Sequence, residues 1–277
     1  MENPDRPLLT FWGVRGSIPT PKPDCLGYGG NTTCLELRLP SGEILIFDGG
    51  TGVNGLGDSL MQRANGECLR LAFFLTHFHW DHIQGIPFFA PLYSPRNEVT
   101  FYSFPDAAHT REVLEGQMTV PYFPVNFGFL PAKRNFEQTA NRPLEFSGTR
   151  VHAFPMNHPQ QAYGYRVEHG GAVLVFASDL EHGNPELDRV LRQQAEGADV
   201  LIYDAQFTPE EYETRRGWGH STWLEATRVA REVGAKRLIL FHHAPEHRDS
   251  TMDEILQHAR EHFPNTEVAR ERSQISF

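Results

Sequence analysis

Residues 76–82 read Thr-His-Phe-His-Trp-Asp-His and bring together four side chains that can bind a metal, directly after the apolar run 69–75. In an extended chain, His77 and His79 point to the same side, so they can share one ion. The Asp and the last His fall where the chain turns and can face a second ion. Imidazole together with carboxylate suits zinc, manganese or iron. The segment therefore predicts a fold that holds two metal ions at a strand end.

Two ions need more ligands than one segment supplies, and three later residues have the same placement behind an apolar run. They are His158 after 151–154, Asp179 after 173–176 and His242 after 238–241. A lone His or Asp at a strand end is more often a cap or a loop residue, but the repeated placement favours ligands. His243 is the alternative to His242, which we prefer because it directly follows its apolar run.

Short apolar runs recur along the 277 residues, separated by 24 glycines and 20 prolines. We expect strands at 8–12, 33–39, 44–47, 69–75, 151–154, 172–176, 200–203 and 237–241. We expect helices at 53–64, 107–115, 185–194, 222–233 and 252–262. No repeat or long linker divides the chain, so one domain over 1–277 is expected. Two strand-rich halves with helices outside favour a four-layer αββα sandwich.

Charge and cysteine content narrow the classes of protein. The net charge is −10, from 25 Lys and Arg against 35 Asp and Glu, which argues against a chain that coats nucleic acid. The three cysteines form no closed disulfide set and no metal-binding pair, as in a reducing compartment. Residues 1–7 lack the features of a secretion signal, and no apolar run approaches the ~18 residues that span a bilayer. These features predict a cytoplasmic protein that does not enter a membrane.

Residues 118–130 form a segment with four aromatic side chains and two prolines. One interpretation is a small hydrophobic cluster beneath a long loop. The other is a lid or a homodimer contact whose aromatic faces can stack a nucleobase.

The spacing of His77, His79, Asp81 and His82 matches the HxHxDH motif, so the chain resembles the metallo-β-lactamase superfamily. The resemblance runs from residue 8 to residue 247 and implies the αββα sandwich. It also implies that one metal takes His77, His79 and His158 and the other takes Asp81, His82 and His242, with Asp179 and a hydroxide bridging the two ions. Two divalent cations are expected, with Zn first and Mn or Fe as alternatives.

Two further motifs are similar to those of the ribonuclease Z-like and cyclic-phosphodiesterase branch: Asp204 in Leu-Ile-Tyr-Asp-Ala-Gln-Phe and His220 in Gly-His-Ser-Thr-Trp-Leu-Glu-Ala. In that branch the acid orients a histidine that protonates the leaving oxygen. Thr222 and Glu225 have capping-box spacing, so a helix is expected just after His220. The free N–H groups at its start, around Ser221 and Thr222, would face an anion.

The N-terminal segments 13–19 and 28–32 resemble those of related phosphonate-pathway cyclic phosphodiesterases. On that basis Arg15 and Asn31 are candidate substrate contacts, although Arg15 is as well suited to bracing a turn. The leading hypothesis is a dinuclear phosphodiesterase acting on a small phosphodiester, such as a cyclic nucleotide, by attack of a metal-bridging hydroxide, with Asp81, Asp204 and His220 in catalytic roles.

Three alternatives stay open. An RNA 3′-end processing nuclease would need a basic patch, for which Lys133-Arg134 and Arg215-Arg216 are candidates, but the acidic charge makes long nucleic acid an unfavoured partner. A thioester or lactone hydrolase would use the same metals without needing His220. A metal-containing binding domain without turnover would be expected to lack a metal ligand, and this sequence keeps them all.

Overall fold

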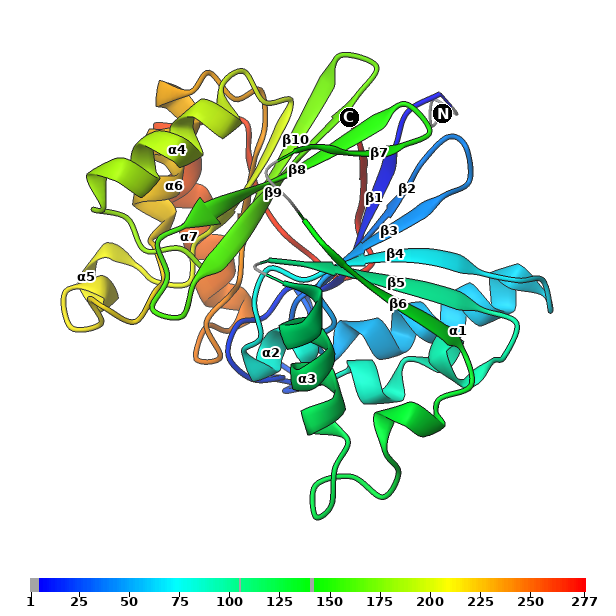
Figure 1. Ribbon diagram of the computed structural model, residues 1–277. Coiled ribbons are helices and arrows are strands. Elements are labelled where there is room, and N and C mark those ends of the chain that lie inside the picture. The colour runs from blue at the N-terminus through cyan, green and yellow to red at the C-terminus, as the bar shows by residue number, and fades with distance from the viewer. Residues whose placement is uncertain (1–4, 105, 140–141) are drawn as a thin grey trace.

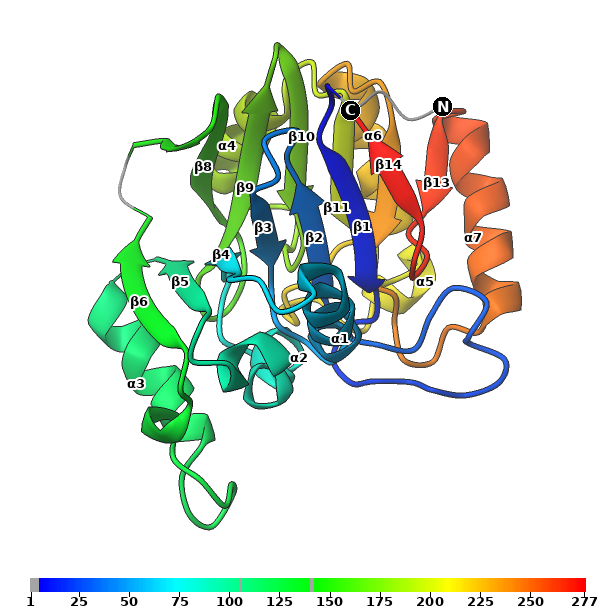
Figure 2. The same cartoon turned by 90° about the vertical axis from the view of Figure 1, so that its right-hand side faces the viewer.

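The computed structural model describes residues 5–104, 106–139 and 142–277. The first four residues, part of the segment in which we expected no secretion signal, lie outside this range. Two seven-stranded sheets face each other, and helices cover both outer faces (Figure 1, Figure 2). The four-layer αββα sandwich is therefore confirmed.

The first sheet has the order β14-β1-β2-β3-β4-β5-β6. Its strands β1, β2 and β14 pair antiparallel, whereas β3 to β6 run parallel. The strand bounds are β1 Leu8–Gly13, β2 Cys34–Arg38, β3 Ile44–Phe47, β4 Arg70–Phe74, β5 Glu98–Ser103, β6 Lys133–Gln138 and β14 Gln274–Ser276.

The second sheet has the order β13-β12-β11-β10-β9-β8-β7. Strands β10 to β13 are parallel and β7 to β10 are antiparallel. The strand bounds are β7 Leu144–Phe146, β8 Thr149–Met156, β9 Ala162–His169, β10 Ala172–Ala177, β11 Val200–Asp204, β12 Leu238–Phe241 and β13 Thr266–Val268.

Helices α1, α2 and α3 lie over the first sheet, and α4, α6 and α7 over the second, as Figure 1 shows. The α-helices are α1 Gly52–Ala64, α2 Trp80–Ile83, α3 Ala107–Gln117, α4 Pro185–Ala195, α5 Pro209–Tyr212, α6 Trp223–Glu232 and α7 Asp249–His262. Short 3-10 turns occupy Ile86–Phe88, Ala90–Tyr93 and Phe127–Phe129. Every predicted helix is present, and each end lies within three residues of its predicted position.

The inner faces of the two sheets share one aromatic core. Phe11 of β1 lies 6.1 Å from Phe241 of β12, and Phe47 of β3 lies 6.0 Å from Phe176 of β10, measured between ring centroids. Burial of these rings holds the two sheets face to face. Because all four are in strands that end near the proposed ligands, the core also fixes the distance between the two halves of the ligand set.

Parallel strands β10, β11 and β12 end at one edge of the second sheet. Ala177 of β10 pairs with Tyr203 of β11, and Asp204 of β11 pairs with Phe241 of β12. The residues that follow these strands therefore come out side by side, which is how residues far apart in the sequence meet.

The aromatic segment 118–130 divides into a buried base and an exposed tip. Met118, Phe127 and Leu130 pack into the core beneath the first sheet, whereas Tyr122 and Phe129 are exposed. Figure 2 shows the segment projecting from the body of the molecule. The cluster interpretation holds for the base, and a role of the tip as a lid or a homodimer contact stays a prediction.

Among the described residues, none of the helices combines the length and the apolar character that crossing a bilayer requires.

Candidate metal centre

Five histidines and two aspartates named from the sequence converge in two adjacent groups where the sheets meet. The first group is His77, His79 and His158, and the second is Asp81, His82, Asp179 and His242. In each group, one ligand atom from every residue lies within 4.8 Å of the others. The second group is fully buried, and the first opens partly to solvent.

The second group has the spacing of a tetrahedral site. Four donors about 2.0 to 2.1 Å from a tetrahedral ion would lie about 3.3 Å from one another. His82 Nε2 is 3.4 Å from Asp81 Oδ2, 3.1 Å from Asp179 Oδ2 and 3.3 Å from His242 Nε2. His242 Nε2 is 3.2 Å from Asp81 Oδ2 and 3.3 Å from Asp179 Oδ2. These donors fit one divalent cation.

Asp179 faces both groups. Its Oδ2 belongs to the second group, while its Oδ1 lies 3.9 Å from His77 Nε2 of the first. In the first group, His79 Nδ1 is 3.2 Å from His158 Nε2. The buried His77 Nε2 has no hydrogen-bond partner among the described residues. An unpartnered imidazole nitrogen directed at two other donors fits a second cation.

The remaining ring nitrogen of every histidine in the two groups has an oxygen acceptor. His82 Nδ1 lies 2.8 Å from Asp48 Oδ2, and His242 Nδ1 lies 2.8 Å from Gln206 Oε1. The corresponding acceptors are Thr76 Oγ1 for His77, Gln160 Oε1 for His79 and the Gly219 carbonyl for His158. Such contacts fix the tautomer and leave the other nitrogen free to bind a metal.

The pKa of a buried histidine shifts in opposite directions in the two groups, and only the second group favours a positive charge. Burial lowers the pKa of His77 well below its ordinary value, with His82 adding to the effect, so this ring is neutral. Burial acts the same way on His82, but the carboxylates of Asp179 and Asp81 outweigh it and raise the pKa of His82 well above its ordinary value. A cation between these carboxylates would take the place of that proton.

His220 lies beside the cluster, as the sequence predicts. Its Nδ1 is 2.9 Å from Asp204 Oδ2, and the other oxygen of Asp204 accepts from the backbone N–H groups of Gln206 and Ser221. Asp204 Oδ2 also accepts from the N–H of Asp179. Burial opposes protonation of His220, but Asp204 outweighs it and raises the pKa of His220. With Nδ1 engaged, Nε2 is the nitrogen left for a substrate.

Arg15 does not have the place that a substrate contact needs. Its guanidinium is fully buried and donates to the carbonyls of Gly29, Ala244, His247 and Cys25. All three guanidinium nitrogens are engaged within the chain, so these contacts are the ones expected if Arg15 braces the loop over residues 15–29.

The other candidate substrate contacts are also engaged within the chain. The Asn31 amide donates to Glu271, the Ser221 N–H donates to Asp204, and Thr222 Oγ1 accepts from the N–H of Glu225. The last contact confirms the predicted cap of α6. The Ser221 N–H is therefore engaged, and a role of the start of α6 in binding an anion stays a prediction.

His242, and not His243, lies in the cluster. His243 Nε2 contacts the Ala269 carbonyl at 2.8 Å, away from the other histidines. Sequence reasoning missed Asp48, Gln160 and Gln206, which hold the rings of His82, His79 and His242. Asp48 carried the same signal as the predicted ligands, since it directly follows the apolar run 44–47.

An αββα sandwich with a group of three histidines beside a group of two histidines and two aspartates is the arrangement of a metal-dependent hydrolase. A family model described as "Beta-lactamase superfamily domain" matches residues 67–243. The chain therefore belongs to the metallo-β-lactamase superfamily, as the HxHxDH motif predicts.

The comparisons with individual proteins point to the ribonuclease Z and PhnP-like branch. The chain is 27% identical to a ribonuclease Z of Bacillus thuringiensis (strain Al Hakam), over 94% of this chain and 96% of that protein. The metallo-β-lactamase fold protein YhfI of Bacillus subtilis has a TM-score of 0.72 and 20% identity, covering 99% of this chain and 100% of that one. A diphosphatase of the PhnP family has a TM-score of 0.69 and 20% identity, covering 98% of both chains. These solved structures support the fold.

Proposed function

We propose that this protein is a dinuclear, zinc-dependent phosphodiesterase that hydrolyses a small phosphodiester, with a cyclic nucleotide as the first candidate. The observation that carries the proposal is His220, held through Nδ1 by Asp204 and placed directly beside the metal ligands Asp179 and His242. Hydrolysis of a phosphodiester needs a proton for the departing alkoxide, and a histidine outside the ligand set is suited to supply it.

The metals, when bound, supply a nucleophile at neutral pH by lowering the pKa of water, and they stabilise the charge on phosphorus. The chain's own groups orient the substrate and move the proton. Asp204 fixes the ring of His220 and favours its protonated form, so that Nε2 donates to the leaving oxygen. Asp48 and Gln206 hold His82 and His242 in place, which keeps the ligand geometry constant during the reaction.

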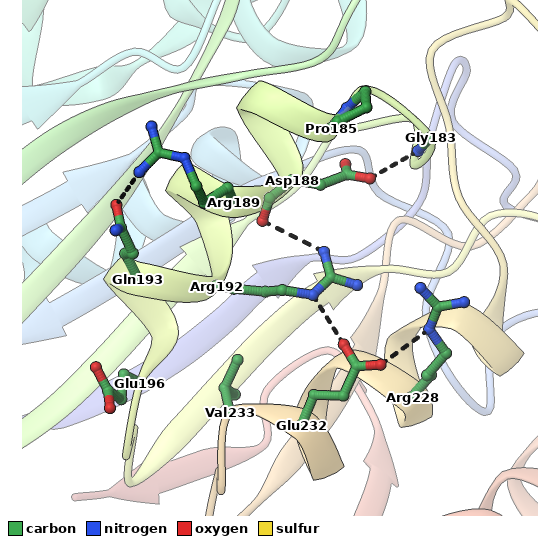
Figure 3. A pocket seen from close by; sticks show the side chains of 10 residues that line it. All are labelled: Gly183, Pro185, Asp188, Arg189, Arg192, Gln193, Glu196, Arg228, Glu232 and Val233. Carbon is green, nitrogen blue, oxygen red and sulfur yellow. Dashed lines mark hydrogen bonds and ion pairs between the residues drawn. The ribbon is translucent and has the colours of Figure 1, made fainter.

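The groove between two outer helices of the second sheet carries no excess of positive charge. This groove lies between α4 and α6 (Figure 3) and carries three arginines and three carboxylates, and Arg192 and Arg228 both pair with Glu232. A polyanion would therefore find little excess positive charge there.

The two basic pairs expected to form a patch are separated and engaged. Lys133 pairs with Glu98, and Arg134 donates to the carbonyls of Leu130 and Ala132. Arg215 pairs with Glu211, and Arg216 pairs with Glu213. Figure 1 shows β6, which carries the first pair, well away from α5, which precedes the second.

Replacing His220 tests the proton-donor role. In His220→Ala we expect metal content to stay at two ions per chain while turnover of a phosphodiester falls by about 10² to 10⁴. His152→Ala, which removes a partly buried histidine on β8 that contacts Gln194, is the matched control and should keep full turnover. Full turnover in metal-loaded His220→Ala would refute the role.

A second candidate is an RNA 3′-end processing nuclease, because the curated relative quoted above is a ribonuclease Z. Rates on a cyclic mononucleotide and on a tRNA precursor would separate the two functions. A steep fall of affinity with salt is expected only for the polyanion.

A further inference from the structure

A groove of about 590 Å³ begins at His158 and contains no other residue of the ligand set. Its walls come from the segments that follow β8 and β10 and from the turn before His220, and they include Asn157, His158, Glu181, His182 and Gly217. Since His158 belongs both to the groove and to the more exposed metal group, a substrate with its phosphorus at the metals can extend into the groove.

His182 supplies the groove with a hydrogen-bonding ring. Its Nδ1 lies 2.9 Å from Ser221 Oγ, and its ring packs 4.4 Å from the ring of Tyr212, measured between centroids. These contacts fix the ring and leave Nε2 for a ligand. Ser221 also donates its N–H to Asp204, so His182 is connected to the group that holds His220.

The carboxylate in the groove wall, that of Glu181, already accepts hydrogen bonds from donors within the chain. The Glu181 carboxylate accepts from the N–H groups of Gly217 and Gly219 and from the hydroxyl of Tyr212. Glu181 therefore shapes the turn over 217–219 and repels a second anionic group. The groove suits an uncharged part of a substrate.

Trp218 follows the wall residue Gly217 and precedes Gly219, whose carbonyl contacts His158, so it belongs to the turn that borders the groove. Trp218 is 62% exposed, so its indole is open to a ligand. An exposed indole beside a groove is a stacking surface for a planar ring, and stacking on an aromatic side chain accepts any base.

We propose that this groove is the subsite for the nucleobase of a nucleoside phosphodiester, with Trp218 stacking on the base and His182 Nε2 contacting its polar edge. The inference rests on the proposed phosphodiesterase function and narrows its substrate class. The groove shares Gly183 and Pro185 with the groove of Figure 3, whose arginines and carboxylates balance in number, so neither groove offers an excess of positive charge to a second anionic group.

A pair of substrates with one leaving group tests the subsite separately from the chemistry. Thymidine 5′-(p-nitrophenyl phosphate) and methyl p-nitrophenyl phosphate both release p-nitrophenol, but only the first carries a base. We expect Trp218→Leu and His182→Ala each to raise KM for the thymidine compound about tenfold, with kcat little changed and with both constants unchanged for the methyl compound. Tyr93→Leu and His152→Ala are the matched controls, an exposed aromatic residue and a histidine outside the groove.

Failure of the subsite and failure of the proposed function give different results. If wild-type protein hydrolyses neither compound, the phosphodiesterase proposal fails. If it hydrolyses both and the two variants leave the KM for the thymidine compound unchanged, or raise both KM values equally, the subsite is refuted while the function stands.

A binding measurement on chelator-treated protein removes any dependence on turnover. Adenosine 5′-monophosphate should quench tryptophan fluorescence in wild-type protein and in Trp80→Leu, which lacks the other strongly exposed indole, but not in Trp218→Leu. Quenching that survives in Trp218→Leu and disappears in Trp80→Leu would place the base on the indole of Trp80 and overturn the proposal.

Discussion

Three residues of the centre have left-handed backbone angles. Asp48, Asp179 and His242, each within two residues of the end of a strand, have φ of 60°, 62° and 63°. Aspartate tolerates this region better than most residues, whereas for histidine it is uncommon. The sharp turn directs each side chain back between the sheets. The backbone is therefore strained at the positions that place two metal ligands and Asp48.

Asp48→Asn tests whether the Asp48 carboxylate, by holding the ring of His82, supports metal binding in the buried second group. Asparagine keeps the shape and tolerates the backbone angle, but it replaces the carboxylate that accepts from His82 Nδ1. We expect metal affinity to fall by about 10- to 100-fold, measured as ions retained per chain after dialysis against a graded chelator.

Asp58→Asn, on the exposed side of α1, is the control and should retain metal as the wild-type protein does. Unchanged retention in Asp48→Asn would show that His82 does not depend on this contact.

At the scale of single residues, the sequence predicts the metal ligands better than it predicts the residues that fix the ligand side chains by hydrogen bonds. Four ligands share seven positions, and three more repeat one placement, so the pattern stands out without a structure. Gln160 and Gln206 carry no comparable signal, because an amide in a loop is common and its partner is distant in the sequence. The sequence left the role of Arg15 open for the same reason. The four carbonyls that accept from its guanidinium belong to segments that are far apart in the sequence.

At the scale of the structural elements, the turn over 217–219 requires glycine at position 219. Gly217 and Gly219 have φ of 85° and 87°, but a Cβ on Gly219 would lie 2.4 Å from His158 Nδ1, whereas one on Gly217 meets nothing within 4 Å. Both alanine variants share the backbone strain, and only Gly219→Ala adds a clash with a ligand.

We therefore expect Gly219→Ala to lose one metal ion per chain from the more exposed group, and Gly217→Ala to keep both, as counted by elemental analysis. Equal metal content in the two variants would mean that the ring of His158 can shift without loss of the ion.

The segment after β12 is tied to α5 by an ion pair that responds to acid. Both oxygens of Glu211 lie 3.0 Å from His247 Nε2. Burial opposes ionisation of Glu211, but hydrogen bonds from His247 and from the backbone N–H of Thr208 outweigh it and lower its pKa from 4.5 to about 2. The folded state thus favours the carboxylate, and this stability is complete above pH 4.5 and is lost as the pH falls towards 2.

Melting curves of metal-free protein test this contact. Above pH 4.5, Glu211→Gln should melt about 2 to 4 °C below the wild-type protein, the shift expected for about 1 kcal/mol, and the difference should shrink between pH 4.5 and 2. A difference that is constant over this range would contradict the pKa assigned to Glu211.

The strands that the sequence did not predict are those without a continuous apolar run. β5 alternates buried and half-buried residues, and β6 at the sheet edge has no fully buried residue. β9 is interrupted by Gly164, where a Cβ would lie 2.4 Å from Phe154 Cζ. Such strands are stabilised by their neighbours in the sheet, and that tertiary effect is not visible in a local pattern.

At the scale of the whole molecule, two bound metal ions would concentrate positive charge at one place in a protein that is acidic overall. The net charge is −10, yet two divalent cations would lie where Asp81 and His82 of the first half meet Asp179 and His242 of the second. A small phosphodiester can reach this point between the sheets, while the acidic surface disfavours a long polyanion. Alternation of strands and helices suggested the layering and the HxHxDH resemblance implied it, but how closely the two halves approach depends on core packing that local patterns do not contain.

The most direct measurement is a hydrolysis panel on metal-reconstituted protein, comparing a cyclic nucleotide and bis(p-nitrophenyl) phosphate with a thioester, a lactone and a β-lactam. The account predicts turnover of the phosphodiesters that is abolished by chelation and restored by Zn²⁺, with little or none on the other three. Turnover confined to the thioester, the lactone or the β-lactam would contradict it.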